Sequence, residues 1–258
     1  MIRVLFWGWY FIGALLLIIF SLPESLQFSN GLFLIFYAGY AMKLMYDGLE
    51  LQIMSDQSVI IAPHPPLGLS AALIWLGGMT VEWVGVHSGK PFGIYEYSDI
   101  LGPLVYGVPI TLGFAWIAVV SSAVLISREF GLTGCRLTVV RALQVGLWTV
   151  IMDLVLDPVA HARGFWHWKT DGGLYGVPWS NFIGWFIVGA ILSLTFWGIK
   201  VTRLSAHRGT RLYQAILILF GLLGLREGLP LCAVIAVLGA LLAEGSLRYA
   251  GSQHKPKL

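Results

Sequence analysis

The chain contains little charge for its length. Only 11% of its 258 residues are Asp, Glu, Lys or Arg, whereas 57% are hydrophobic. A water-soluble fold with so few charges would expose large apolar patches, so this composition excludes a soluble globular protein. The net charge of +3 is too small to indicate nucleic-acid binding. The sequence therefore predicts an all-α integral membrane protein, with residues 1–258 forming a single membrane domain.

Cysteine is also scarce. The chain has only Cys135 and Cys232, which are too few for a disulfide framework and do not form a metal-ligand pair with local histidines. They indicate neither a redox compartment nor a cofactor. We interpret both as small packing residues.

Long apolar runs, by contrast, are abundant. A helix needs about 20 apolar residues to cross a bilayer. The seventh run is the weakest, because its uninterrupted apolar part, residues 212–225, is short enough for a re-entrant segment, and seven full spans remain an alternative. The runs predict a polytopic bundle of eight spans, near residues 4–22, 31–49, 67–86, 104–127, 137–157, 181–199, 212–228 and 230–247.

Lysine and arginine are distributed unevenly between the predicted loops. With eight spans, most of the 16 basic residues fall on the side of the two termini. Positively charged loops remain in the cytoplasm. We therefore expect a multi-pass protein of the cell membrane with both termini cytoplasmic, and with loops 87–103 and 158–180 on the opposite face.

Two segments of the chain share an order of motifs. In each, an acidic residue near the end of a span is followed by a histidine, an aromatic-x-aromatic pair, Tyr-Gly-Val-Pro, and a tryptophan seven residues beyond the proline. We interpret residues 82–116 and 157–185 as a parallel helix–loop–helix repeat, which brings both loops to one side of the membrane. The alternative is that two interfacial loops share Gly, Pro and aromatic residues by chance.

Three acidic residues interrupt the apolar runs, namely Glu82, Asp153 and Asp157. A carboxylate at helix-centre depth costs about 2.5–3.5 kcal/mol, so it is expected to face the protein interior. Asp153 and Asp157 are one helical turn apart and share a face, and we expect the helix to end at Asp157, before Pro158. Two carboxyls in one apolar site would share a proton. Alternatively, these acids are structural, capped by Trp, Tyr or backbone donors or paired with Arg163.

Aromatic pairs and histidines accompany these acids. In a non-helical loop, a spacing of two places both rings of a pair on one side, and ring faces stabilise a positive charge. An acid beside such rings is suited to protonating an alkene of a lipid-soluble polyene, because the rings would stabilise the cation that protonation produces. The pairs are Tyr95 with Tyr97 and Trp166 with Trp168.

The histidines permit a second interpretation. His87 and His161 are either substrate contacts or ordinary interfacial hydrogen-bonding groups. A metal site that combines them with His167 and the acids is a further alternative. No His-x-x-x-His or Glu-x-x-His spacing supports that alternative, so we expect no metal.

At these residues the sequence resembles a known family. The segments PFGIYEYSDILGPLVYGVP, DLVLDPVAHARGFWHW and YGVPWSNFIGW are similar to membrane-bound carotenoid biosynthesis proteins of the CruF type. These are the carotenoid 1,2-hydratases, which include the bisanhydrobacterioruberin hydratases. The likeness is densest between Glu82 and Trp185.

The resemblance implies hydration of the terminal C1–C2 double bond of an acyclic ψ-end carotenoid, such as lycopene, γ-carotene or bisanhydrobacterioruberin. Carotenoid, water and membrane lipids would be the partners, together with other enzymes of the carotenoid pathway. No redox cofactor is expected, because hydration changes no electron count.

We hypothesise that protonated Asp153 is the general acid toward C2. Asp157 or Glu82 would position and deprotonate the water that attacks C1. The remaining candidates shield the cation or contact the substrate, and they are Tyr95, Tyr97, Trp166, Trp168, His87, His161 and Asn181. Two other functions stay open: a carotenoid cyclase that uses the same cation, and a non-catalytic carotenoid-binding or transport protein.

Overall fold

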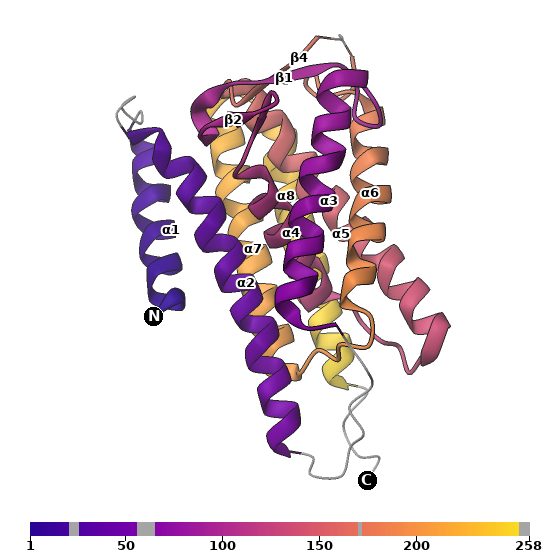
Figure 1. Cartoon of the computed structure of the whole chain (residues 1–258). Helices are drawn as coiled ribbons and strands as arrows, with labels where there is room; N and C mark the ends of the chain where they lie inside the picture. Colours follow the sequence, from indigo (N-terminus) through magenta and orange to yellow (C-terminus); the bar gives the residue numbers. More distant parts are fainter. Residues whose placement is uncertain (21–25, 56–64, 170–171, 253–258) are drawn as a thin grey trace.

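The computed structural model describes residues 1–20, 26–55, 65–169 and 172–252. Within these ranges the chain forms an up-and-down bundle of α-helices (Figure 1). The helices are α1 (Ile2–Ile19), α2 (Phe28–Ser55), α3 (Leu67–Ser88), α4 (Leu112–Ile126), α5 (Gly134–Ala162), α6 (Trp179–Ser193), α7 (Arg203–Arg226) and α8 (Pro230–Ser252). The short elements are β1 (Tyr95–Tyr97), β2 (Leu104–Val105), β3 (Val108–Pro109), β4 (Trp166–Trp168) and the 3-10 helices η2 (Asp99–Leu101) and η3 (Leu194–Phe196).

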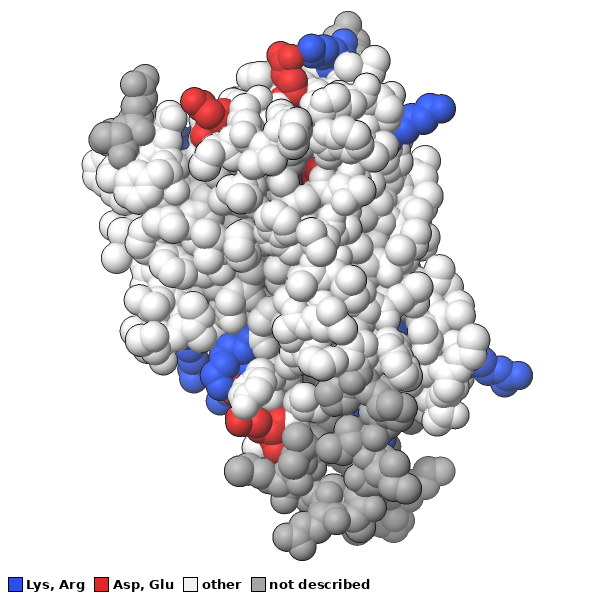
Figure 2. Space-filling view, viewed as in Figure 1, with Lys and Arg blue, Asp and Glu red and all other residues white. Residues whose placement is uncertain are grey.

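The bundle has the character of a multi-pass membrane protein. Five helical segments of the described chain are long and apolar enough to cross a membrane: α1, α3, α5, α6 with η3, and α8. Figure 2 shows lysine, arginine and acidic side chains at the two ends of the visible face, with a broad uncharged band between them. This is the distribution that a bilayer imposes. Which end faces the cytoplasm stays a prediction.

Helix α7 was the weakest expected span, and it is one continuous helix of 24 residues rather than a re-entrant segment. The Thr202 side chain caps it by accepting a hydrogen bond from the Ser205 backbone N–H at 3.2 Å. Its polar residues bond to neighbouring helices: Gln214 donates to the Ala240 carbonyl of α8, and Tyr213 donates to the Trp148 carbonyl of α5. Its polarity therefore reflects burial among other helices.

Pro158 does not end its helix, contrary to expectation. Helix α5 continues through it to Ala162. A proline inside a helix leaves the carbonyl four residues earlier without its N–H partner. Here that carbonyl belongs to Leu154, and the Cys232 thiol of α8 lies 4.0 Å from it as a weak donor. A neighbouring helix therefore supplies a donor that allows α5 to extend past the proline.

Each Tyr-Gly-Val-Pro motif makes a tight turn. Tyr106 and Gly107 both have positive φ between β2 and β3, and Tyr175 and Gly176 repeat this conformation beside the Leu174–Val177 bridge. Two successive residues of positive φ are typical of a two-residue hairpin, and glycine adopts that conformation without strain. The first hairpin uses the start of the expected span 104–127, so α4 begins only at Leu112.

Helix α4 occupies the centre of the bundle, where it contacts α2, α3, α5, α6 and α7. Its Trp116 is fully buried and packs against Gly78 of α3. A Cβ atom added at Gly78 would lie 2.5–2.8 Å from three atoms of Trp116. The close approach of α3 to α4 therefore requires glycine at this position.

We expect Gly78→Ala to destabilise the protein by about 1–3 kcal/mol, because overpacking must displace Trp116 or separate the helices. Thermal unfolding in detergent measures this effect. Gly68→Ala in the same helix is the matched control, since a Cβ atom there meets nothing within 4 Å. Equal unfolding temperatures for the two variants would contradict this account of the α3–α4 contact.

Candidate active site

The two predicted loops meet at one end of the bundle. Strand β1 pairs with β4 in antiparallel register, with Tyr95 opposite Trp168 and Tyr97 opposite Trp166. The middle residues of both strands, Glu96 and His167, are exposed. Because alternate residues of a strand point to opposite faces, all four aromatic rings lie on the inner face. The expected one-sided orientation of both pairs is confirmed.

Glu82 of α3 lies directly under this strand pair and is buried, with 3% of its surface exposed. The Tyr95 and Tyr97 hydroxyls donate to its Oε2 at 2.6 and 2.7 Å, and Trp116 Nε1 donates to its Oε1 at 2.9 Å. Burial and the nearby Glu82 raise the pKa of both tyrosines, so their hydroxyls stay protonated donors. Glu82 therefore acts as an acceptor in all three hydrogen bonds.

Asp153 and Asp157 form a second buried acidic group on α5, with 0% and 3% of their surfaces exposed. One amide group connects them: Asn181 Nδ2 donates to Asp157 Oδ2 at 2.6 Å and to Asp153 Oδ2 at 2.8 Å. This shared donor holds the two carboxyl groups next to each other. Among the described residues, Asp153 Oδ1 has no hydrogen-bond partner. This pair is therefore less completely satisfied than Glu82.

Arg163 does not pair with these aspartates. Its guanidinium Nη1 lies 2.8 Å from Glu227 Oε1 in the loop after α7. The structure thus gives no support to an Asp–Arg ion pair, and the amide of Asn181 is the observed donor to both carboxyls.

Aromatic rings surround the acids on the side of the strands. The ring centroids of Tyr95 and Trp168 are 4.8 Å apart, and those of Tyr97 and Trp166 are 5.6 Å apart. In the described part of the chain, the indole N–H groups of Trp166 and Trp168 are buried without an acceptor. The site therefore has a largely apolar, π-rich wall beside its carboxyl groups.

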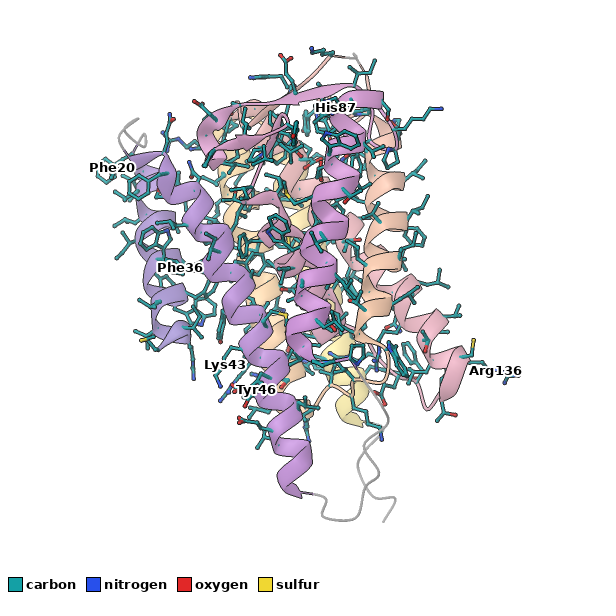
Figure 3. The ribbon with its side chains drawn as sticks, in the orientation of Figure 1. Phe20, Phe36, Lys43, Tyr46, His87 and Arg136 are labelled. Carbon is teal, nitrogen blue, oxygen red and sulfur yellow. The ribbon has the colours of Figure 1, made fainter. Side chains whose placement is uncertain are left out.

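The hydrogen bonds observed for His87 and His161 go to backbone carbonyls and not to the carboxyl groups of the site. His87 is exposed near the end of α3 (Figure 3), where its Nδ1 lies 2.8 Å from the Trp83 carbonyl. His161 Nδ1 lies 3.2 Å from the Trp166 carbonyl, and its ring centroid is 6.0 Å from that of the exposed His167. Within the described ranges, no group of three His, Cys, Asp or Glu side chains is arranged to hold a metal.

An apolar cavity of about 290 Å³ adjoins the site. Leu156 and Ala160 of α5 line it, and they share a helical face with Asp153 and Asp157 through spacings of three, four and seven residues. Trp166 of β4 is also on its wall. The cavity thus borders α5 at residues next to the carboxyl pair, although Asp153 and Asp157 are not among its lining residues.

Sequence reasoning did not select two tryptophans that complete the site. Trp116 and Trp185 stack with centroids 4.3 Å apart; the first donates to Glu82 and the second lines the cavity. Both are the tryptophans seven residues beyond a Tyr-Gly-Val-Pro proline. That shared position, which also marks the repeat, is the sequence signal that could have identified both residues.

Chemically, the arrangement combines two kinds of acidic group. Glu82 is held by three donors, whereas Asp153 has one oxygen without a partner among the described residues and belongs to α5, a helix that lines an apolar cavity. Two close carboxyls that share one proton can donate it at one end and accept one at the other. Such a site is suited to proton transfer on an apolar molecule.

Comparison with known proteins identifies the family of the chain. The bisanhydrobacterioruberin hydratase of Haloarcula japonica is 36% identical over 130 residues, which cover 50% of this chain and 44% of that relative. The match thus spans less than half the relative's length. No solved structure matches the chain. Residues 53–243 match the family model described as carotenoid biosynthesis protein. Because this match covers most of the sequence, the chain belongs to the carotenoid biosynthesis protein family.

Proposed function

We propose that this protein adds water across the terminal C1–C2 double bond of an acyclic ψ-end carotenoid. The observation that carries the proposal is the buried group of Asp153, Asp157 and Asn181 on α5 and α6, two helices that also line an apolar cavity. Family membership supports a carotenoid substrate, and similarity to a bisanhydrobacterioruberin hydratase supports hydration. Water and the carotenoid are the reactants, and the chemistry requires no change of oxidation state.

In the proposed reaction, Asp153 carries the proton that the pair shares and transfers it to C2. The positive charge develops at C1, which is tertiary. Asp157 accepts a proton from water as the water oxygen bonds to C1. One proton enters, one leaves and one water is consumed, so transfer of the proton from Asp157 back to Asp153 restores the starting state. Asn181, bonded to both carboxyls, holds them in place for that transfer.

We assign Glu82 an anchoring role, although it was a candidate base. Its three hydrogen bonds come from Tyr95, Tyr97 and Trp116, and together these connect α3, β1 and α4. A carboxylate with its oxygens engaged in this way is poorly placed to take a proton from water. Asp157 is therefore the proposed base.

The aromatic rings are proposed to protect the cation. Trp166 lines the cavity, and the rings of Tyr97 and Trp166 meet edge to face. Ring faces stabilise a nearby positive charge by about 0.5–2 kcal/mol. Asn181 is better explained as a positioning residue for the aspartates than as a substrate contact. A substrate contact for exposed His87 gains no support from its position.

The first prediction concerns the product. Expressed in cells that accumulate lycopene or bisanhydrobacterioruberin, the protein should convert the pigment to a more polar one that is heavier by one water for each end hydrated. Mass spectrometry of the extracts measures this. A less polar isomer of unchanged mass would indicate a cyclase, and unchanged pigment with both substrates would exclude the proposed hydratase.

The second prediction concerns the proton donor. Asp153→Asn should lower turnover by about a hundred- to ten-thousand-fold, because an amide cannot deliver the proton. Folding should persist, since the new amide keeps an oxygen for Asn181 and offers an N–H to Asp157. Glu96→Gln is the matched control, because this nearby acid points outward and pairs with Lys169. Near wild-type turnover in Asp153→Asn would remove Asp153 from the mechanism.

The third prediction separates anchoring from proton transfer. Glu82→Gln should lower the free energy of unfolding by about 1–3 kcal/mol, because the new amide N–H would face a donor where an oxygen now accepts. Its unfolding temperature should fall well below that of Asp153→Asn. If Glu82→Gln kept its stability but lost turnover as completely as Asp153→Asn, Glu82 would belong to the reaction and not to the anchor.

A further inference from the structure

The cavity has two walls of different origin. One wall comes mainly from α4, α5, α6, α7 and β4, all within the segment that matches the family model, residues 53–243. The opposite wall comes from α1 and from the first turns of α2, which precede that segment. Gly13 of α1 and Phe33 and Tyr37 of α2 are among its residues. The part of the chain outside the family match therefore supplies half of the cavity lining.

The rim of the cavity is apolar and exposed. Ile12, Leu26 and Phe28 line it while 64%, 40% and 58% of their surfaces are exposed. In a bilayer, such side chains face lipid rather than water. The cavity thus opens toward the hydrocarbon region, where a carotenoid dissolves.

Helix α1 forms one side of this opening and is held to α7 by hydrogen bonds. The Tyr10 hydroxyl donates to the Ala215 carbonyl at 2.8 Å, and Arg226 donates to the carbonyls of Leu17 and Phe20. Both sets of bonds connect α1 to α7. Apart from Phe6 and Tyr10, the side chains of α1 are at least partly exposed.

The size of the cavity limits what it can hold. Its volume of about 290 Å³ is at the lower end of the roughly 300–1,000 Å³ of small-molecule sites. Its lining runs along α1 from Trp9 to Leu17, roughly 12 Å at 1.5 Å per residue. This space fits the branched end of a polyene but not a whole carotenoid, whose remaining chain would extend through the rim into lipid.

We propose that α1 and α2 form the specificity wall of the site, and that the lack of a side chain at Gly13 provides room for the terminal isoprene units. This inference rests on the proposed function only in taking the occupant to be a carotenoid. A Cβ atom added at Gly13 meets no atom within 4 Å, so the position faces open space within the cavity. A larger side chain there would occupy the end group's place.

Gly13→Phe tests the inference, with Gly8→Phe as the matched control. Both glycines are in α1 and both have open space at Cβ, but only Gly13 lies on the cavity wall. Purified from lycopene-accumulating cells, Gly13→Phe should retain less carotenoid, counted as lycopene plus its hydrated products, than wild type by about tenfold or more, as for a filled apolar pocket. Gly8→Phe should retain as much as wild type. Visible absorbance measures the pigment, and thermal unfolding checks the fold.

A graded series keeps the test decisive. If Gly13→Phe fails to fold, Gly13→Ala and Gly13→Leu should lower the total retained carotenoid in order of side-chain size. Equal retention across folded variants, or neither lycopene nor hydrated product on wild type, would overturn the inference. Wild type that retains lycopene without adding water to any tested pigment, while Gly13→Phe loses it, would overturn the hydratase proposal and support the binding wall.

Discussion

Three carboxyl groups buried in an apolar bundle are the constraint on which the rest of the structure depends. Each must find donors, because an unsatisfied buried carboxyl is costly. Glu82 obtains its donors from β1 and α4, and β1 is held in place by pairing with β4. The aspartates obtain theirs from Asn181 at the start of α6. Satisfying the acids therefore fixes both loops and the positions of α3, α4, α5 and α6 relative to one another.

Composition predicted the fold class, because 57% hydrophobic residues with few charges permit little else. It could not predict the elements whose partners are distant in the chain. Helix α5 continues past Pro158, and a thiol from α8 approaches the Leu154 carbonyl that the proline leaves without its N–H partner. Helix α7 appeared weak because its polar residues find partners on α5 and α8. Local propensity contains no information about partners that are distant in the chain. The end of α5 and the continuity of α7 therefore differed from expectation for the same reason.

The sequence likewise indicated which residues form the site better than it indicated the role of each residue. The spacing of two in Tyr95 and Tyr97 correctly placed both rings on one face, but it could not show that their hydroxyls point to Glu82. Asn181 was selected as a substrate contact, yet in the structure it connects two carboxyls. Hydrogen-bond geometry depends on side-chain direction across helices, and periodicity reports only which face a residue occupies.

The contrast between the acids is the strongest argument for separate roles. Glu82 has a donor on each oxygen, as a structural group requires. Asp153 keeps a buried oxygen with no partner among the described residues, a condition that native proteins rarely tolerate without a use. Asp153 is on α5, whose Leu156 and Ala160 line the cavity, and α1 and α2 line the cavity from the other side. The carboxyl group that keeps an unpartnered oxygen thus belongs to a helix that borders the space for an apolar molecule.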